Sequence, residues 1–210
     1  VLPPEIGQLV KLQKLDLRGT QLSTLPSKIA QLTQLQELDI GGSQLSQFPS
    51  ELLKLPNLRK LSLSSKGMTA LPPELFQLTQ LEELDIGNNP LGELPPEIGR
   101  LVQLKELSLN RTQLRVLPPE IGQLVRLQKL DLGHNQLSTL PPEIGQLTQL
   151  QKLKIGDNRL STLPQNMTQL KKLETLDCRK NLLSIPSEIF AEHVIWQDLG
   201  KVQEFLHHCC

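Results

Sequence analysis

Carboxylates recur along the chain at a fixed interval of 23 residues, a pattern that could supply oxygen ligands for a cation. The series reads Asp16, Asp39, Ser62, Asp85, Ser108, Asp131, Lys154 and Asp177. Hard cations such as Ca²⁺ need about six oxygens that converge on one point. Because serine and lysine interrupt the series, single carboxylates in a row do not provide that cage, and we expect no metal site.

The chain ends in a run of zinc-binding residue types, His207 to Cys210. Zinc sites use spaced pairs of ligands, and four consecutive residues cannot readily surround one ion. A Cys-Cys ending also fits a prenylation signal, but we favour a frayed end. His134 and His193 are isolated from any Ser or Cys nucleophile, and no phosphate-binding loop occurs. The sequence therefore predicts no enzyme activity and no cofactor.

The same interval governs the apolar residues. The pattern Leu-x-x-Leu-x-Leu begins at Leu12, Leu35, Leu58, Leu81, Leu104, Leu127, Leu150 and Leu173, without insertion or deletion. In one unit, Leu130 and Leu132 alternate with polar residues, which predicts a short strand with one buried face. Pro141-Pro142-Glu143 then predicts a helical turn, because proline is tolerated in the first turn of a helix.

One such unit cannot bury all of its leucines, whereas stacked units can. The sequence therefore predicts an α/β solenoid with a parallel sheet on its concave face and short helical or 3-10 returns on its convex face. Leu84 and Leu130 should be buried, while Asp85 and Asp131 should be exposed on the sheet.

These units resemble the leucine-rich repeat, and the segment Leu-Pro-x-Glu-Ile-Gly-x-Leu resembles its Ras-group type. The resemblance implies a buried turn asparagine that bonds the backbone of neighbouring coils. That position reads Thr20, Ser43, Lys66, Asn89, Thr112, Asn135, Asn158 and Asn181. Hydroxyls can make part of these bonds, but lysine cannot accept one. We expect the Lys66 side chain to point outward, an irregular turn over 64–68, and added stability from asparagine at this position.

We divide the chain into repeats over 1–190 and a capping segment with a tail over 191–210. Residues 1–11 match the second half of a repeat, so we expect a fragment of a longer protein. A helical spacing of apolar residues predicts a capping helix over 194–207. Phe190, Trp196 and Phe205 would cover the end of the core.

Composition bears on partners and compartment. The chain has 210 residues with 22 basic and 22 acidic side chains, so its formal net charge is zero. This balance argues against a nucleic-acid partner and against binding to an anionic membrane surface. No apolar run reaches the roughly 18 residues of a membrane span. Three cysteines favour a reducing, cytoplasmic setting. The oligomeric state is not specified by the sequence.

Three positions of each repeat should face the concave side. One residue of each repeat is the candidate for partner binding: Arg18, Asp39, Lys60, Asp85, Glu106, Asp131, Lys154 and Arg179. The face is charged, mixed in sign and without aromatic residues. It is therefore expected to bind a protein partner through electrostatic complementarity.

Two other functions fit the same repeats. The chain could be the sensor or recruiting arm of a Roco GTPase, a nucleotide-binding immune receptor or an effector ubiquitin ligase, or a consensus-like scaffold without a natural ligand. For concave binding, reversing Asp85 and Asp131 should weaken the complex at little cost in stability, and reversing Glu97 and Glu143 should not. The opposite result would favour the convex face, where Phe76 replaces a glycine and should project its ring.

Overall fold

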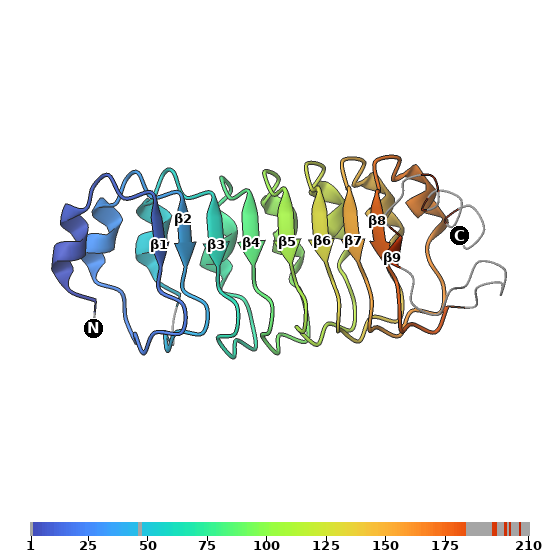
Figure 1. Ribbon diagram of the computed structural model, residues 1–210, viewed down its shortest axis with the longest axis horizontal. Helices are drawn as coiled ribbons and strands as arrows, with labels where there is room; N and C mark the ends of the chain where they lie inside the picture. The colour runs from blue at the N-terminus through green and yellow to red at the C-terminus, as the bar shows by residue number, and fades with distance from the viewer. Residues whose placement is uncertain are drawn as a thin grey trace.

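The computed structural model describes residues 2–45, 48–183, 195–196, 200, 202 and 206, and shows a solenoid of stacked coils (Figure 1). Each coil contributes one three-residue strand to a single parallel sheet. The strands are β1 Lys14–Asp16, β2 Glu37–Asp39, β3 Lys60–Ser62, β4 Glu83–Asp85, β5 Glu106–Ser108, β6 Lys129–Asp131, β7 Lys152–Lys154 and β8 Thr175–Asp177. The predicted α/β solenoid is confirmed.

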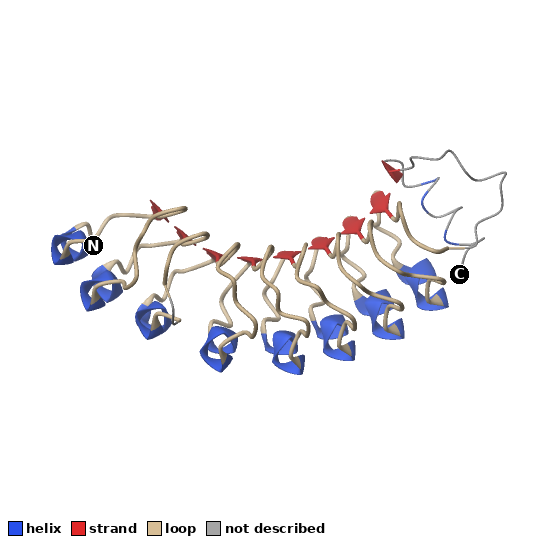
Figure 2. Ribbon diagram, turned by 90° about the horizontal axis from the view of Figure 1, so that it is seen from below, coloured by secondary structure: helices blue, strands red, loops and turns tan. Residues whose placement is uncertain are grey.

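Each return contains a five-residue 3-10 helix on the convex side, and the strands line the concave side (Figure 2). The helices are η1 Pro4–Gln8, η2 Ser27–Gln31, η3 Ser50–Lys54, η4 Pro73–Gln77, η5 Pro96–Arg100, η6 Pro119–Gln123, η7 Pro142–Gln146 and η8 Gln165–Gln169. Extended prolines such as Pro118 and Pro141 precede them and set the entry into each first turn. The sheet curves because the helices are wider than the strands that they connect.

The strands pair in exact repeat register, so that equivalent residues lie side by side. Leu84 of β4 pairs with Leu107 of β5, and Leu107 with Leu130 of β6. Leu84 and Leu130 are 2% and 1% exposed, as predicted. The core is a row of leucines that neighbouring coils bury for one another.

The convex position of Phe76 corrects one expectation. The Phe76 side chain is 2% exposed and does not project into solvent. Its position faces the next coil: at the equivalent Gly122, an added Cβ would lie 2.7 Å from Gln146 Oε1 and 2.9 Å from Glu143 Cβ. The Phe76 ring therefore packs between coils and offers no anchor to a partner.

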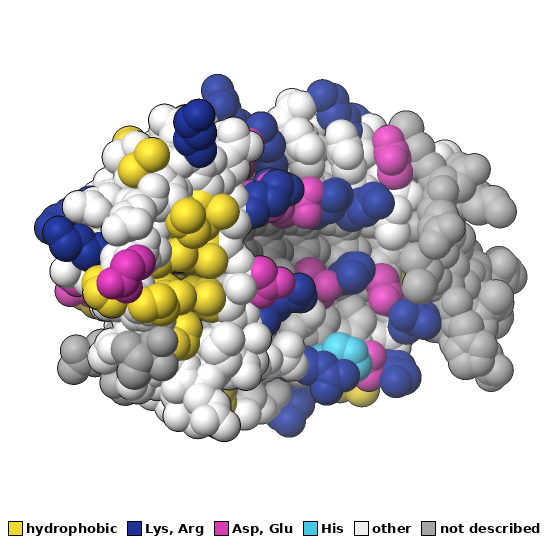
Figure 3. Space-filling view, turned by 60° about the vertical axis from the view of Figure 1, so that its left-hand side comes forward, with side chains coloured by type: hydrophobic (Ala, Val, Ile, Leu, Met, Phe, Trp, Pro, Cys, Tyr) yellow, Lys and Arg dark blue, Asp and Glu magenta, His cyan; other side chains and the backbone are white. Residues whose placement is uncertain are grey.

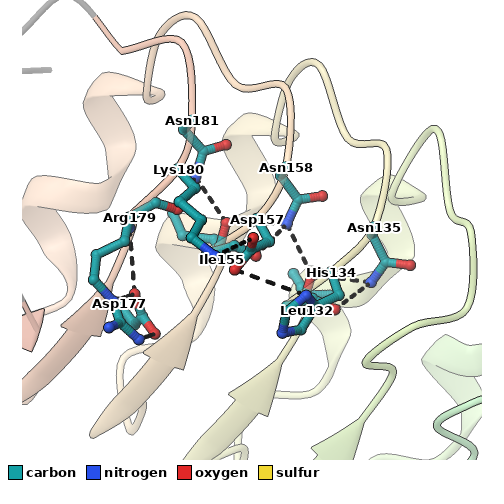
Figure 4. Close-up of polar contacts among 12 residues, drawn as sticks. Leu132, His134, Asn135, Ile155, Asp157, Asn158, Asp177, Arg179, Lys180 and Asn181 are labelled. Carbon is teal, nitrogen blue, oxygen red and sulfur yellow. Dashed lines mark hydrogen bonds and ion pairs between the residues drawn. The ribbon is translucent and has the colours of Figure 1, made fainter. Parts of the chain in front are cut away.

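A ladder of asparagines ties the coils together (Figure 4). Asn135 Nδ2 donates to the carbonyl of Leu132 in its own coil at 2.9 Å and to that of Leu109 in the preceding coil at 2.8 Å. Its Oδ1 accepts from the N–H groups of Thr112 and Leu114, both at 3.0 Å. One amide thus satisfies four backbone groups in a region that water does not reach.

At three of the equivalent positions, a threonine or serine makes part of the hydrogen bonds that asparagine makes, as predicted. Thr20 Oγ1 donates to the Leu17 carbonyl at 2.8 Å, and Ser43 Oγ to the Ile40 carbonyl at 2.7 Å. Thr112 Oγ1 makes the same bond to Leu109 at 2.7 Å. These short side chains donate to the carbonyl three residues earlier in the same coil.

Lys66 corrects a second expectation, because its side chain lies toward the preceding coil. Its ammonium donates to Ser43 Oγ at 2.8 Å and to the Ser43 carbonyl at 3.3 Å. The turn keeps the bonds of the Lys66 and Met68 N–H groups to Asn89 Oδ1 and the positive φ of Ser65, 54°. It departs from the turn over 133–137 at Gly67, which has a φ of 66°, so the expected irregularity is present at that residue. The ammonium replaces the donors of an asparagine but not its acceptor. Burial lowers the pKa of Lys66.

The C-terminal segment differs in part from the predicted helix over 194–207. Ile195–Trp196 form strand β9, antiparallel to β8, so these two residues are not helical. Residues 200, 202 and 206 are helical, and Val202 and Leu206 are buried. The β8 edge explains the difference, since its unpaired backbone groups favour an added strand. Phe190 and Phe205 lie outside the described residues, as does the Trp196 side chain.

Truncation of the leucine row should unfold the domain at a lower denaturant concentration. We expect Leu130→Ala to lower the free energy of unfolding by about 2–5 kcal/mol, because the cavity lies between three coils. Urea titration followed by circular dichroism measures this loss. The matched control is Leu182→Ala, since Leu182 is 68% exposed. Equal losses in both variants would contradict the packing described.

Replacing Lys66 should remove a specific destabilisation. Lys66→Asn should raise the free energy of unfolding by about 1 kcal/mol, because the amide can accept bonds from the preceding coil. In the wild type the pKa of Lys66 is lower in the folded chain than in the unfolded chain. At pH values between these two pKa values, the unfolded chain therefore binds more protons than the folded chain. Stability should therefore rise with pH in that window.

Urea titrations across alkaline pH test both statements. The variant should lack the rise that the wild type shows. Lys171→Asn at an exposed position is the control and should leave the stability and its pH dependence unchanged. A less stable Lys66→Asn variant would show that the Ser43 bonds outweigh the missing acceptor.

Candidate functional site

The concave face is a shallow groove lined by side chains from β1 to β7. Basic and acidic side chains both lie along it (Figure 3). Three columns run across the strands, formed by the first residue of each strand, the third residue, and the residue two positions after the strand. All eight predicted candidates lie in these columns, one per coil, and the repeat register brings them into one strip.

Ion pairs link much of the first column. Lys60 Nζ lies 2.7 Å from Glu83 and 3.7 Å from Glu37, and Lys14 lies 2.9 Å from Glu37. The hydrogen bond between Lys60 and Glu83 raises the pKa of Lys60, although partial burial acts to lower it. Lys14 is exposed and the other three side chains are half-buried at the edge of the groove, so solvent screens each pair and each contributes little stability.

Two places in this column bring like charges together. Glu83 pairs in register with Glu106, and Lys129 with Lys152. Glu106 has a lysine on its other side, with Lys129 at 2.5 Å. Within the part of the chain described, Lys152 has no ion-pair partner. Adjacent like charges on neighbouring strands are unfavourable, so the column is not arranged for stability alone.

The aspartate column has a structural role that the sequence analysis missed. Asp85 Oδ1 accepts from the Gly87 N–H at 2.9 Å, and Asp131 Oδ1 accepts from the Gly133 N–H at 3.0 Å. Both side chains are half-buried, not exposed as expected. Aspartate side chains often bond the backbone two residues onward in this way. Charge reversal here would therefore disturb the turn as well as the surface.

The two terminal arginines are held by aspartates of their own coils. Arg18 Nη2 lies 2.7 Å from Asp16 Oδ2, and Arg179 Nη2 lies 2.9 Å from Asp177 Oδ2 (Figure 4). Burial acts to raise the pKa of Asp177, but its hydrogen bonds from Arg179 outweigh this and hold the pKa below its usual range. The side chain and backbone of Arg18 similarly lower the pKa of Asp16. Neither arginine is an unpaired anchor.

Asp85 and Lys152 are the charges best placed to meet a partner. Among the described residues, no basic side chain lies within ion-pair distance of Asp85. Lys154, by contrast, is 3.1 Å from Asp131. Lys152 was not among the predicted candidates, although the first column read down the repeats shows lysine beside lysine.

The described residues contain no group of three or more His, Cys, Asp or Glu side chains that could hold a metal ion. Among these residues, no helix is long and apolar enough to cross a membrane. The run from His207 to Cys210 lies outside the described residues.

The turn-anchoring role of Asp85 predicts different effects for two uncharged replacements. Asp85→Ala should lower the free energy of unfolding by about 1 kcal/mol, because the Gly87 N–H loses its acceptor. Asp85→Asn keeps an Oδ1 and should change stability much less. Thermal denaturation of both variants provides the comparison, and similar melting temperatures would contradict the role.

Comparisons with known proteins agree with this geometry. The leucine-rich repeat region family matches residues 1–87 and 96–204, and a single leucine-rich repeat matches residues 80–101. A search of curated proteins finds no significant match.

Solved structures share the fold at moderate identity. A leucine-rich repeat protein of Leptospira interrogans is 43% identical, with a TM-score of 0.80 over 88% of this chain and 48% of that one. The plant peptide hormone receptor RGFR1 in complex with RGF2 is 34% identical, with a TM-score of 0.70 over 87% and 31%. TLR13 in complex with ssRNA13 is 30% identical, with a TM-score of 0.76 over 88% and 27%.

The chain thus spans about half or less of each of these structures. The family match covers nearly all of it, and the repeats, the parallel sheet and the asparagine ladder agree with that match. The chain belongs to the leucine-rich repeat family.

Proposed function

We propose that this chain is a protein-recognition module that seats its partner on the concave face. The observation that carries the proposal is the continuous groove across β1 to β7, lined by charged side chains of both signs. Its like-charge neighbours are unfavourable in the unbound chain. A partner that presents the opposite charges would relieve them, so the binding energy is available at these positions.

The order of charges along the groove indicates what such a partner presents. Glu83, Asp85 and Glu106 place acidic groups together on β4 and β5. Lys129, Lys152 and Lys154 place basic groups together on β6 and β7. A complementary partner would carry a basic patch and an acidic patch side by side, in that order along the solenoid.

Relatives support a binding role and leave the ligand class to experiment. The RGFR1 structure contains the peptide hormone RGF2, whereas the TLR13 structure contains ssRNA13. We favour a protein partner because the groove is mixed in sign and its lining contains no aromatic side chain. Single-stranded RNA is bound by basic grooves with aromatic stacking platforms.

The larger setting is also a proposal. A sensor or recruiting arm of a multidomain enzyme or receptor would use the same groove, and the sequences that flank these repeats would identify that arrangement. A scaffold without a natural ligand would bind nothing specifically. A cytoplasmic setting is supported by the small number of cysteines, three in 210 residues.

The test uses variants that remove charge without disturbing the turn. A partner is captured from a lysate of the source organism, purified, and titrated against each variant by calorimetry. Asp85→Asn with Lys152→Gln removes the two unpaired concave charges and leaves the net charge unchanged. This variant should weaken binding about tenfold, because each lost contact is a charged one at an interface.

Glu97→Gln with Glu143→Gln is the convex control and should bind like the wild type. Both variants should melt near the wild-type temperature. Loss of binding in the convex control alone would move the interface to the 3-10 helices. A captured ligand that is RNA would replace the protein partner of this proposal.

A further inference from the structure

A second surface runs beside the concave face, where the chain turns after each strand. One residue per coil there has a positive φ, and in the first seven coils its N–H bonds to the next coil. Arg111 N–H, for example, donates to the Gly133 carbonyl at 3.0 Å. The row reads Gly19, Gly42, Ser65, Asn88, Arg111, His134, Asp157 and Lys180, with φ between 53° and 63°. Its side chains therefore lie in one line along the edge of the sheet.

The composition of this row changes halfway along the solenoid. The first four coils carry only uncharged residues, two of them glycines, which adopt this conformation without strain. The last four carry Arg111, His134, Asp157 and Lys180. A side chain of arginine or lysine at positive φ costs free energy that glycine would not. The fold accepts glycine at this position, so the charged residues are not required by the turn.

Charge accumulates on this half of the edge. Arg159 lies two residues after Asp157 and is exposed, as are Arg111 and Lys180. We define the basic edge as Arg111, His134, Asp157, Arg159 and Lys180. Figure 4 shows His134, Asp157 and Lys180 of this set. Three permanent cations accompany one carboxylate. Among the described residues, Arg111 and Arg159 have no ion-pair partner.

The single carboxylate organises part of the edge. Asp157 Oδ1 lies 3.1 Å from Lys180 Nζ, and its Oδ2 lies 3.7 Å from His134 Nδ1. These contacts hold side chains of three successive coils in a line, while the two arginines remain available. The arrangement suits an extended chain that places acidic groups at the spacing of the coils.

We propose that the basic edge binds an acidic peptide segment of a protein partner. This inference does not rest on the concave face being the docking surface, because its residues lie in the turns. An acidic peptide fits better than a nucleic acid for two reasons. Asp157 would repel a continuous phosphate backbone, and the described aromatic side chains offer no stacking platform, since Phe76 is buried and Phe48 is half-buried.

Fluorescence anisotropy tests the proposal with a fluorescein-labelled peptide of alternating glutamate and serine. The variant Arg111→Gly with Lys180→Gly removes two cations and relieves positive-φ strain. It should bind about tenfold more weakly than the wild type at low salt, because two exposed charge contacts are lost. Its melting temperature should not fall, which separates binding from folding.

The matched control removes the same two charges elsewhere. Arg126 and Lys172 are exposed and lie in the segments that precede the strands. The variant Arg126→Gln with Lys172→Gln should retain wild-type affinity. If the glycine variant is less stable, Arg111→Asn with Lys180→Asn replaces it, since asparagine tolerates positive φ. A peptide of alternating glutamine and serine should not bind.

Three results would overturn the proposal. The first is a wild type that does not bind the acidic peptide, and the second is an equal loss in the edge and control variants. The third is tighter binding of single-stranded polyuridine that depends on Arg111 and Lys180, which would assign the edge to nucleic acid. The concave variant Asp85→Asn with Lys152→Gln should bind the peptide normally, so failure of one proposal is distinguishable from failure of the other.

Discussion

No coil of this molecule can bury its own leucines, and the rest of the structure follows from that constraint. The leucines of β4, β5 and β6 lie in register and cover one another. Backbone groups between coils are then removed from water and need partners. Asn135 supplies four of these bonds with one amide, three of them to the preceding coil. Packing and hydrogen bonding therefore enforce the same coil-to-coil spacing.

This spacing converts a sequence period into surface rows. Any residue repeated every 23 positions lies beside its equivalents, so charge along a row is set one coil at a time. The buried rows are nearly invariant leucine, whereas the first concave column and the positive-φ row vary from coil to coil. The buried leucine rows provide most of the stability. The proposed binding surfaces lie in the variable rows, where substitution disturbs the fold least.

The aspartate column shows that this separation has limits. Asp85 faces the groove, yet its Oδ1 holds the Gly87 N–H and so supports the turn. The same carboxylate contributes to the fold through one oxygen and to the groove through its charge. Asparagine separates these contributions because it preserves the acceptor and removes the charge. The structure thus identifies the substitution that a surface map alone would not suggest.

Much of the fold could be predicted from the sequence, because the leucine period specifies strand positions, register and the buried face. The partial bonding of Thr20, Ser43 and Thr112 also followed from hydroxyl chemistry. Side-chain contacts between coils were harder to predict from the sequence. The sequence shows that Lys66 lacks an acceptor but not that Ser43 offers two oxygens to its ammonium. It shows a phenylalanine at 76 in place of glycine, but not that this position faces the next coil. The charged positive-φ residues were missed because φ is not visible in residue spacing.

The most direct test of the account is a lysine footprint of the domain with and without its captured partner. Acetylation followed by mass spectrometry reports which ammonium groups a partner covers. The account predicts protection of Lys152 and Lys154 in the groove and of Lys180 on the basic edge. Lys28 and Lys54, exposed on the convex helices η2 and η3, should react equally in both states. Protection of Lys28 and Lys54 with unchanged labelling of Lys152 and Lys154 would contradict it.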